Sequence, residues 1–347
     1  MTIIGGARFV DKQQRRILYA MALNRAGHAP LSFRKGKSME QTMATTRMSA
    51  RTWGLLALLG MIWGGSFFFA RVAVLHVPPA TLVLLRVGIA AVALHLYVAG
   101  RFGIYATLGA RWREFLLLGL INNAVPHMLI FLGQTQIGAG LASILNATTP
   151  IFTVLIANRM TTDEKLSPEK IAGCLIGLVG TAVLIGPRAL APFTGDGGPP
   201  LWAVVLPVLA AVSYGLAATY GKRFRGTAPP VIAAGQLTAA TLLMLPVSLA
   251  LDSPWQIALP PLPAILAVLA LALLSTAYGY ILFFRIMAAA GATNTSLVTL
   301  LVPPSAILAG MLFLGERLTP LGIAGMALVL LGLVVLDGRV LARIRGR

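Results

Sequence analysis

Residues 164–180, EKLSPEKIAGCLIGLVG, return in altered form at residues 316–332 as ERLTPLGIAGMALVLLG. Eight of the 17 positions are identical at a constant offset of 152, and Arg317 keeps the charge of Lys165. In each copy a proline follows the charged residues, and proline can begin a helix without losing a hydrogen bond. An uncharged run follows, from residue 171 in the first copy and from residue 321 in the second. The pattern predicts a loop that leads into a membrane helix, present twice through duplication.

The duplication extends upstream of this stretch, with small insertions and deletions. The matching pairs are Pro150/Pro303, Gly64/Gly215, Arg71/Lys222 and Pro79/Pro229. We predict two copies of one unit, 53–186 and 201–337, joined by a linker rich in proline and glycine at 187–200. Residues 338–347 form a basic tail.

Residues 1–52 are predicted to be a basic, disordered tail without a signal peptide. Met39, Met43 and Met48 closely precede the first apolar run. The start codon can therefore lie further downstream than residue 1. The alternative is a genuine basic tail that lies on anionic lipid.

The composition is that of a membrane protein. Hydrophobic residues make up 57% of the 347 residues and charged residues 11%, and the mean hydropathy is +0.84. In a soluble protein the net charge of +18 would suggest a nucleic-acid partner. Here the basic residues lie in the tails and in short loops between apolar runs, which indicates membrane orientation instead. The single cysteine, Cys174, excludes an intramolecular disulfide and a cysteine metal cluster.

The fold class predicted is an all-α integral membrane protein with ten transmembrane helices as two inverted five-helix repeats. Each apolar run is near the ~20 residues that a bilayer requires. Residues 115–158 carry no formal charge, and the polar turn at 134–140 divides them into two spans. The other spans are predicted at about 53–70, 79–100, 168–186, 201–221, 229–251, 262–284, 292–314 and 320–336.

The distribution of positive charge orients these spans. With a cytoplasmic amino terminus, 24 of the 28 Lys and Arg residues fall inside, among them Arg285 in a predicted loop after residue 284. Both termini are then cytoplasmic. Because five is odd, the second copy enters from the opposite face, and such an inverted repeat is typical of a transporter that alternates access around a midplane site.

Polar side chains within the spans are the first candidates for a substrate pathway, because they are costly in a bilayer. Arg86 is the only formal charge deep in a span. It could bind a substrate carboxylate through its two-pronged donor geometry. The alternative is a structural arginine that reaches toward the interface or binds carbonyl groups, which we slightly favour because Gln236 takes the equivalent place in the second copy.

The other candidates have amide, imidazole, hydroxyl or aromatic side chains. His127 could carry a proton, or could be a neutral histidine that bonds a neighbouring helix. Trp63 lies away from the interfacial belt and could form an aromatic wall. From a second-half set that also contains Tyr220, Thr276, Tyr280 and Thr295, we select six. The full selection is Trp63, Ser66, Arg86, Asn122, Asn123, His127, Asn146, Thr149, Tyr214, Gln236, Ser275, Tyr278, Asn294 and Ser296.

Enzymatic chemistry is not indicated. All ten acidic residues lie in tails, loops or span ends, and there is no phosphate-binding loop, His-Glu-x-x-His motif or nucleophile elbow. We expect no catalytic residue, no metal and no cofactor. Gly60/Gly64 and Gly173/Gly177 are small pairs that fit close helix packing, within one chain rather than between two.

Four stretches resemble the EamA-type permeases of the drug/metabolite transporter superfamily, over residues 53–337. They are Trp63-Gly64-Gly65-Ser66-Phe67, Pro78-Pro79 leading to Arg86, Asn146-Ala147-Thr148-Thr149-Pro150, and Gly315-Glu316-Arg317-Leu318-Thr319-Pro320. The resemblance implies a ten-helix carrier in the plasma (bacterial inner) membrane. It also implies export of amino acids or other small metabolites, driven by a gradient and without ATP.

The predicted function is therefore a secondary active exporter of a small metabolite such as an amino acid. The alternatives are a flippase for a lipid-linked substrate and, ranked lower, a membrane assembly partner without transport. The expected partners are a small-molecule substrate and the lipid bilayer, with proton coupling left open and no nucleic acid. The chain is expected to be a monomer or a homodimer.

Overall fold

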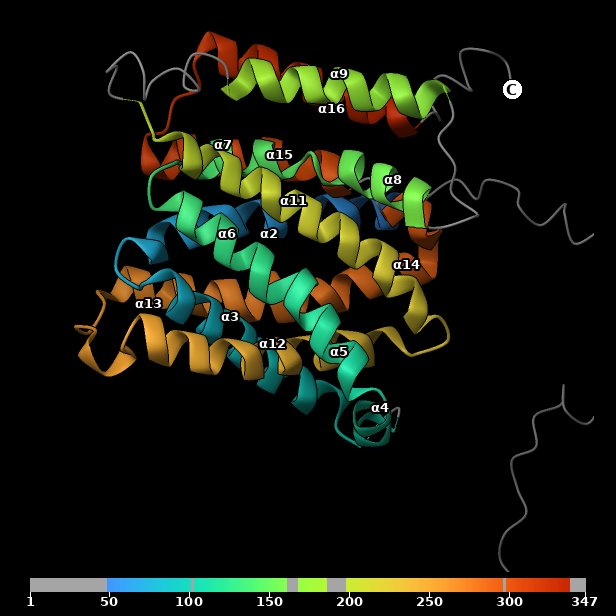
Figure 1. Ribbon diagram of the computed structural model, residues 1–347, viewed down its shortest axis with the longest axis vertical. Helices are drawn as coiled ribbons and strands as arrows, with labels where there is room; N and C mark the ends of the chain where they lie inside the picture. The colour runs from blue at the N-terminus through green and yellow to red at the C-terminus, as the bar shows by residue number, and fades with distance from the viewer. Residues whose placement is uncertain (1–48, 101–102, 161–167, 186–197, 296–297, 338–347) are drawn as a thin grey trace, which may run out of the picture. The chain divides into compact units, whose positions relative to one another are not determined.

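The computed structural model describes residues 49–100, 103–160, 168–185, 198–295 and 298–337, and within these ranges every regular element is helical. Met48–Arg347 forms one compact unit. In the first copy the helices are α2 (Ala50–Val74), α3 (Pro79–Val98), α4 (Ile104–Ala110), α5 (Trp112–Gly119), the π-helix η2 (Leu120–Ala124), α6 (Val125–Gln134), α7 (Ala139–Asn146), α8 (Thr149–Met160) and α9 (Pro168–Ile185) (Figure 1). The second copy contains α11 (Leu201–Gly221), the 3-10 turn η4 (Lys222–Phe224), α12 (Pro229–Leu251), the 3-10 turn η5 (Pro254–Gln256), α13 (Leu262–Leu269), the π-helix η6 (Ala270–Tyr278), α14 (Gly279–Thr295), α15 (Val298–Leu314) and α16 (Pro320–Asp337).

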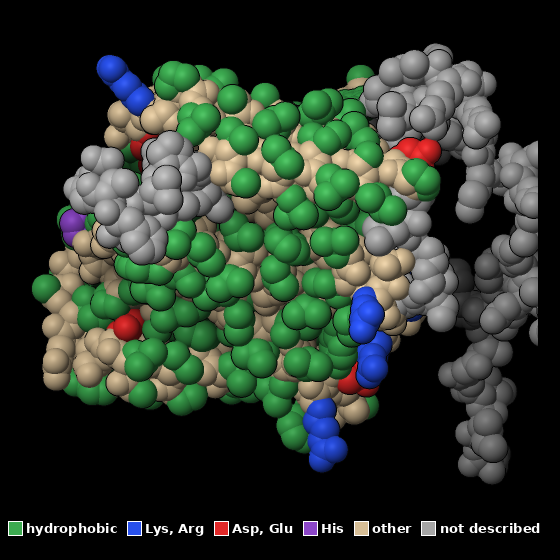
Figure 2. All heavy atoms as spheres, turned by 45° about the horizontal axis from the view of Figure 1, so that its top comes forward, with side chains coloured by type: hydrophobic (Ala, Val, Ile, Leu, Met, Phe, Trp, Pro, Cys, Tyr) green, Lys and Arg blue, Asp and Glu red, His purple; other side chains and the backbone are tan. Residues whose placement is uncertain are grey.

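Seven helical runs in the described ranges are long and apolar enough to cross a membrane. They are Ala50–Val74, Pro79–Val98, Trp112–Gln134, Ala139–Met160, Leu201–Phe224, Pro229–Leu251 and Leu262–Ala290, followed by two shorter apolar helices at Leu301–Leu314 and Pro320–Val335. Hydrophobic side chains cover most of the face in Figure 2, while charged side chains gather toward its edges. The chain is thus an all-helical membrane protein, and the count of ten spans stays a prediction.

Several predicted boundaries differ from the structure, and the ninth span, predicted from residue 292, is a helix that begins at Val298. The first span begins at Ala50 rather than 53, because Ser49 caps the helix and its hydroxyl accepts a bond from the Thr52 N–H at 3.2 Å. The eighth span continues past residue 284 to Thr295, so Arg285 lies within α14 and not in a loop. The alanine-rich stretch 288–290 favours helix and gives the chain no reason to turn there.

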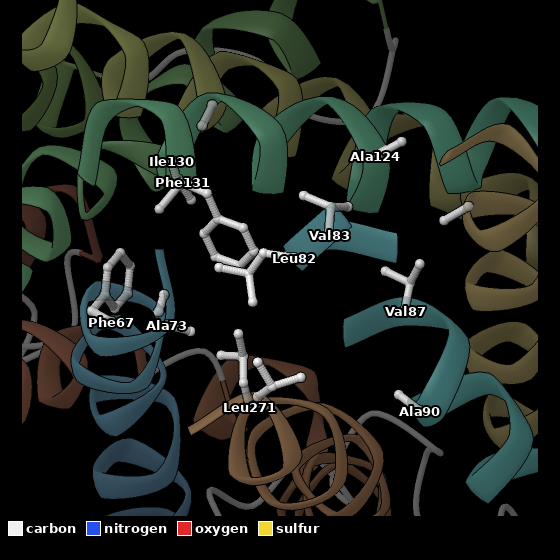
Figure 3. Packing of buried hydrophobic residues seen from close by; sticks show 14 of the residues in the cluster. Phe67, Ala73, Leu82, Val83, Val87, Ala90, Ala124, Ile130, Phe131 and Leu271 are labelled. Carbon is white, nitrogen blue, oxygen red and sulfur yellow. The ribbon is translucent and has the colours of Figure 1, made fainter. Parts of the chain in front are cut away.

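The helices pack mainly across the two copies of the repeat. In the described ranges α3 packs on α12, α2 on α15, α11 on α6 and α8, and α9 on α16. One large apolar core holds these elements together, and Figure 3 shows side chains of α2, α3, α6 and η6 pointing toward one another. Because each of these pairs joins one copy to the other, neither copy buries its apolar surface alone.

Glycine permits the closest helix crossings. A Cβ atom at Gly64 would lie 2.8 Å from the backbone nitrogen of Ala306 in α15, and one at Gly332 would lie 2.6 Å from that of Gly177 in α9. Neither site can take a larger side chain unless the helices separate. The small pairs in the sequence therefore pack within the chain.

The π-helices η2 and η6 occupy equivalent positions in the two copies. Pro126, just after η2, has no N–H, so it cannot bond the carbonyl five residues back as π geometry would require. That carbonyl belongs to Ile121, and it accepts a bond from the Ser213 hydroxyl of α11 at 2.7 Å. In η6 the Thr276 hydroxyl donates to the carbonyl of Leu271 at 2.8 Å. Such segments often mark functional sites, and both of these contribute to the site described below.

Candidate functional site

A cavity of about 430 Å³ lies between the two copies of the repeat. Its walls come from α2, α3, α5, η2 and α6, the α7–α8 segment, α11, α12, η6 and α14, and α15. This volume is within the range of about 300–1,000 Å³ that is usual for small-molecule sites. The cavity lies among the helices that form the main apolar core, so the cavity walls and the packed core belong to the same elements.

Ten of the fourteen candidate residues from the sequence line this cavity. They are Trp63, Ser66, Arg86, Asn122, His127, Asn146, Thr149, Tyr214, Gln236 and Ser275. Asn123 is fully buried and does not line the cavity, and Tyr278 is 40% exposed and also lies outside its wall. The side chain of Asn294 and the whole of Ser296 lie outside the described part of the structure.

Tyr280 lines the cavity in place of Tyr278, together with four phenylalanines that were not selected from the sequence: Phe67, Phe131, Phe283 and Phe284. Trp63 stacks on Phe283 with ring centroids 5.5 Å apart, which builds one aromatic wall. A phenylalanine in an apolar run carries no signal that separates cavity lining from core. Only the spacing of Phe283 and Phe284 to Tyr280 on one helix could have suggested them.

Arg86 presents its charge to this cavity. Its Nε donates to the Thr276 hydroxyl at 3.0 Å, and its guanidinium carbon lies 5.7 Å from the centroid of the Phe131 ring. No Asp or Glu is among the described residues that line the cavity. A cation in a low-dielectric site without a carboxylate partner is costly, so the cavity as described favours an anionic group on a ligand.

Polar pairs cross between the copies in a nearly symmetric way. Arg86 of α3 bonds Thr276 of η6, while Gln236 of α12 accepts a bond from the amide of Asn122 in η2 at 2.7 Å. Each pair joins the second helix of one copy to the π-helix of the other. The predicted equivalence of Arg86 and Gln236 is thus matched by equivalent contacts.

Two stacked ring pairs show the same correspondence at an offset of 153. His127 stacks on Phe131 with centroids 6.1 Å apart, and Tyr280 stacks on Phe284 with centroids 6.0 Å apart. The His127 ring also meets the Tyr214 ring edge to face at 6.4 Å. The two copies therefore supply equivalent aromatic walls that differ in their polar atoms.

Charged side chains hold one end of the bundle together, which we call the Glu316 end (connections 75–78, 135–138, 252–261 and 315–319). The Glu316 carboxylate accepts bonds from the N–H groups of Ala139 and Gly140 at 2.7 and 3.0 Å. Arg71 donates to the carbonyl groups of Gln134 and Thr135. These contacts tie the α15–α16 connection and α2 to the α6–α7 connection.

A second carboxylate acts at the same end. Asp252 accepts bonds from the backbone N–H and the hydroxyl of Thr81, at 2.6 and 2.9 Å. This contact joins the end of α12 to the beginning of α3. Below these contacts Gln134 is fully buried and donates to the Phe67 carbonyl at 2.8 Å, which closes the cavity on this side.

The opposite end, which we call the Arg111 end (103–111 and 222–228), has different contacts. Arg111 pairs with Glu114, donates to the Thr227 hydroxyl at 2.9 Å and lies over the Phe224 ring at 4.3 Å. The cavity lining extends toward this end as far as Gly221 and Ile232. Toward the Glu316 end the lining extends as far as Ala70 and Gln134, which are 1% and 0% exposed.

Asn123 offers a stability prediction. Its amide is fully buried, and neither polar atom has a hydrogen-bond partner among the described residues. Asn123→Leu, which is similar in volume, removes a buried unsatisfied group that costs about 1–3 kcal/mol. We expect a higher unfolding temperature in detergent with transport retained. The matched change Asn122→Leu breaks the bond to Gln236 and should lower transport; a lower unfolding temperature for Asn123→Leu would contradict the interpretation.

The described residues contain no group of three or more His, Cys, Asp or Glu side chains that could hold a metal ion. The chemistry of the site is that of one cation, several neutral hydrogen-bonding groups and aromatic rings. Such a site can bind and orient a small molecule.

Comparison with known proteins agrees with this description. A probable terminal-alkyne amino-acid exporter of Streptantibioticus cattleyicolor is 27% identical over 86% of this chain and 97% of its own. An uncharacterized transporter of Archaeoglobus fulgidus is 26% identical over 82% and 98%. The uncharacterized inner membrane transporter YedA of Escherichia coli is 27% identical over 81% and 89%.

One crystal structure has the same fold with a TM-score of 0.57 at 20% identity, over 86% of this chain and 100% of that one. The family described as EamA-like transporters matches the sequence twice, at residues 51–186 and 201–336. These two matches cover most of the chain. It is a membrane transport protein that belongs to the EamA-like transporter family.

Proposed function

We propose that this protein is a secondary active transporter that exports a small metabolite of the amino-acid class. The observation that carries the proposal is the cavity between the two copies, which holds Arg86 without a lining carboxylate and is walled by aromatic rings. The exporter from Streptantibioticus, whose name refers to an amino acid, supports the same substrate class. The carboxylate of the substrate would bind Arg86, and the aromatic walls would contact its apolar part.

Ten membrane spans in two inverted repeats, 53–186 and 201–337, would supply the transport cycle. In such a repeat the two copies exchange conformations, so that the site opens to one side and then to the other. The crosswise bonds from Arg86 to Thr276 and from Asn122 to Gln236 support this symmetry. With the Glu316 end closed, the described conformation would be the one that takes up substrate from the Arg111 end.

Proton coupling would involve His127. It lines the cavity, and its unperturbed pKa is the one among the lining side chains closest to neutrality. Arg86 of α3 and Tyr214 of α11 face it. Replacement by glutamine, whose carbonyl oxygen keeps a hydrogen-bond acceptor, would keep solute binding and abolish accumulation driven by a pH gradient.

The Arg111 end would face the cytoplasm of a bacterial inner membrane, with both termini on that side. Five basic residues lie at this end (Arg111, Arg113, Lys222, Arg223 and Arg225), against Arg71 and Arg317 at the Glu316 end. This asymmetry supports the orientation. Positive charges orient a membrane protein mainly when they lie in short loops, and the connections at both ends of this bundle are short.

Cysteine labelling tests the orientation. In a Cys174→Ser background, Leu259→Cys marks the Glu316 end, where Leu259 is 88% exposed, and Ala110→Cys marks an exposed position at the Arg111 end. We expect an impermeant maleimide added to intact cells to label residue 259 alone, and residue 110 only after permeabilisation. The reverse pattern would invert the orientation. Labelling of both in intact cells would contradict the ten-span topology.

Transport itself is tested in proteoliposomes that contain the purified full chain. Radiolabelled alanine, leucine and phenylalanine are trapped inside at 1 mM, and efflux is followed with and without a pH gradient. We expect gradient-dependent efflux of at least one of the three, absent from liposomes with Arg86→Gln protein. Scrambling of a fluorescent lipid without movement of any soluble solute would favour the flippase alternative and overturn the proposal.

A further inference from the structure

Three polar atoms in the wall of the cavity lack a hydrogen-bond partner among the described residues. They are Nδ1 of His127, Oε1 of Gln134 and Oδ1 of Asn146. All three residues line the cavity, and His127 and Gln134 are 5% and 0% exposed. Buried polar atoms in proteins are nearly always paired, so three unpaired ones around one cavity need an explanation.

These atoms can all accept hydrogen bonds, and they come from two helices that contact each other. His127 and Gln134 lie on α6, two turns apart on nearly the same face, and Asn146 ends α7. Gln134 already uses its amide nitrogen for the Phe67 carbonyl, which leaves its oxygen as the remaining group. In the neutral imidazole one ring nitrogen is an acceptor. The cavity thus contains a cluster of acceptors.

A ligand with several N–H donors fits this cluster. A primary ammonium carries three donors and no acceptor, and in this cavity it would find no lining carboxylate. Neutral oxygens and an imidazole nitrogen would therefore have to bind the ammonium in place of a carboxylate, much as carbonyl groups bind cations elsewhere in membrane proteins. Arg86 alone suits only an anionic group of a ligand. The acceptor cluster adds a position that suits a cationic group.

The position of Arg86 relative to the cluster indicates one ligand that spans both. The Phe131 ring lies 5.7 Å from the guanidinium carbon of Arg86 and 6.1 Å from the His127 ring, so the cation and one of the acceptors lie near the same ring in the cavity wall. We propose that Asn146, Gln134 and His127 form an ammonium subsite, and that the substrate is an amino acid bound as a zwitterion, with its carboxylate on Arg86. This inference rests on the proposed function and specifies which of its solutes are bound.

Matched ligand triads test the subsite in the purified full chain. Each triad contains an amino acid, the acid that lacks its ammonium and the amine that lacks its carboxylate. The triads are alanine, propanoate and ethylamine; leucine, 4-methylpentanoate and 3-methylbutylamine; and phenylalanine, 3-phenylpropanoate and 2-phenylethylamine. Affinity is measured by the quenching of tryptophan fluorescence, since Trp63 lines the cavity. In the triad that binds, we expect the amino acid to bind at least about tenfold more tightly than its acid, as lost charge-assisted bonds imply.

Variants separate the subsite from a structural role. Asn146→Leu and Gln134→Leu should weaken binding of the amino acid by about tenfold and leave binding of the acid unchanged, so that the preference for the amino acid disappears. Arg86→Gln should weaken binding of both. Thr148→Val is the matched control, because its hydroxyl is bonded to the Leu145 carbonyl at 2.7 Å and Thr148 does not line the cavity. The Thr148→Val variant should prefer the amino acid over the acid as strongly as the parent protein does.

Two results would overturn the subsite. Equal affinity for amino acid and acid in the parent would show that the acceptors bind only water. An equal loss of affinity for both ligands in Asn146→Leu and Gln134→Leu would show that the acceptors support the fold. In either case efflux of an acid from proteoliposomes would leave the transporter proposal standing, whereas the absence of movement of any triad member would remove that proposal and the subsite with it.

Discussion

Arg86→Gln is expected to reduce transport by about 100-fold or more, because it removes a charge-assisted, two-pronged contact with the substrate carboxylate that is worth several kcal/mol in a desolvated site. The same change should raise the unfolding temperature of the empty protein. Among the described residues Arg86 has one hydrogen bond, to Thr276, and no lining carboxylate, so its charge is a cost to the fold when no ligand is bound. Glutamine can keep a bond to Thr276 without that cost.

The opposite signs of these two effects separate the two interpretations of Arg86. A structural arginine would make Arg86→Gln less stable as well as less active. Arg86→Lys serves as the intermediate variant, because it keeps the charge and loses the planar fork. Efflux from proteoliposomes and thermal unfolding in the same detergent measure both properties. Reduced transport together with a lower unfolding temperature would support the structural role instead.

Much of the helix arrangement can be predicted from the sequence, because its causes are local. Apolar runs of bilayer length, prolines at helix starts and the repeat at an offset near 152 mark the helices before any contact is known. The main error, at Arg285, arose because a single charge was taken as the end of a span. In the structure the alanines after it continue the helix to Thr295.

The cavity lining could be predicted in part for a related reason. A polar side chain in an apolar run must face another helix or a cavity, and here ten of the fourteen selected residues line the same one. The position of Tyr278 outside the cavity wall has a geometric cause. Tyr278 ends the π-helix η6, where the wider turn changes which residues share a face, so Tyr280 lines the cavity instead.

The features that give the site its chemistry depend on contacts between distant parts of the chain. The lack of a carboxylate near Arg86 and the unpaired acceptors of Gln134 and Asn146 are properties of the assembled cavity. The tie between Glu316 and the start of α7 is another. No periodicity within one helix can indicate that a residue in the α15–α16 connection binds the backbone at residue 139.

This Glu316 contact leads to the second prediction of large effect. Its carboxylate accepts two N–H bonds at the N-terminus of α7, where the helix dipole also favours negative charge. A Cβ at Gly138 would lie only 2.5 Å from Oε1, so the loop is shaped around the carboxylate. Glu316→Gln removes the charge and one acceptor. Hydrogen bonds to charged groups are worth about 1.5–3 kcal/mol. The ratio of molecules with a closed Glu316 end to molecules with an open one should therefore fall by roughly tenfold or more.

A cysteine at Ala70 reports this opening, because Ala70 lines the cavity on the side of the Glu316 end and is 1% exposed. In a Cys174→Ser background, we expect an impermeant maleimide added outside intact cells to label Ala70→Cys about tenfold faster when Glu316→Gln is present. Arg317→Gln is the matched control, since Arg317 is an exposed neighbour and its replacement also changes the charge by one unit. Glu316→Asp keeps the charge on a shorter side chain and should give an intermediate rate. If the glutamine variant labels no faster than Arg317→Gln, the contact is a cap for α7 without influence on access, and the closure of this end must be attributed to Arg71, Asp252 and the buried Gln134.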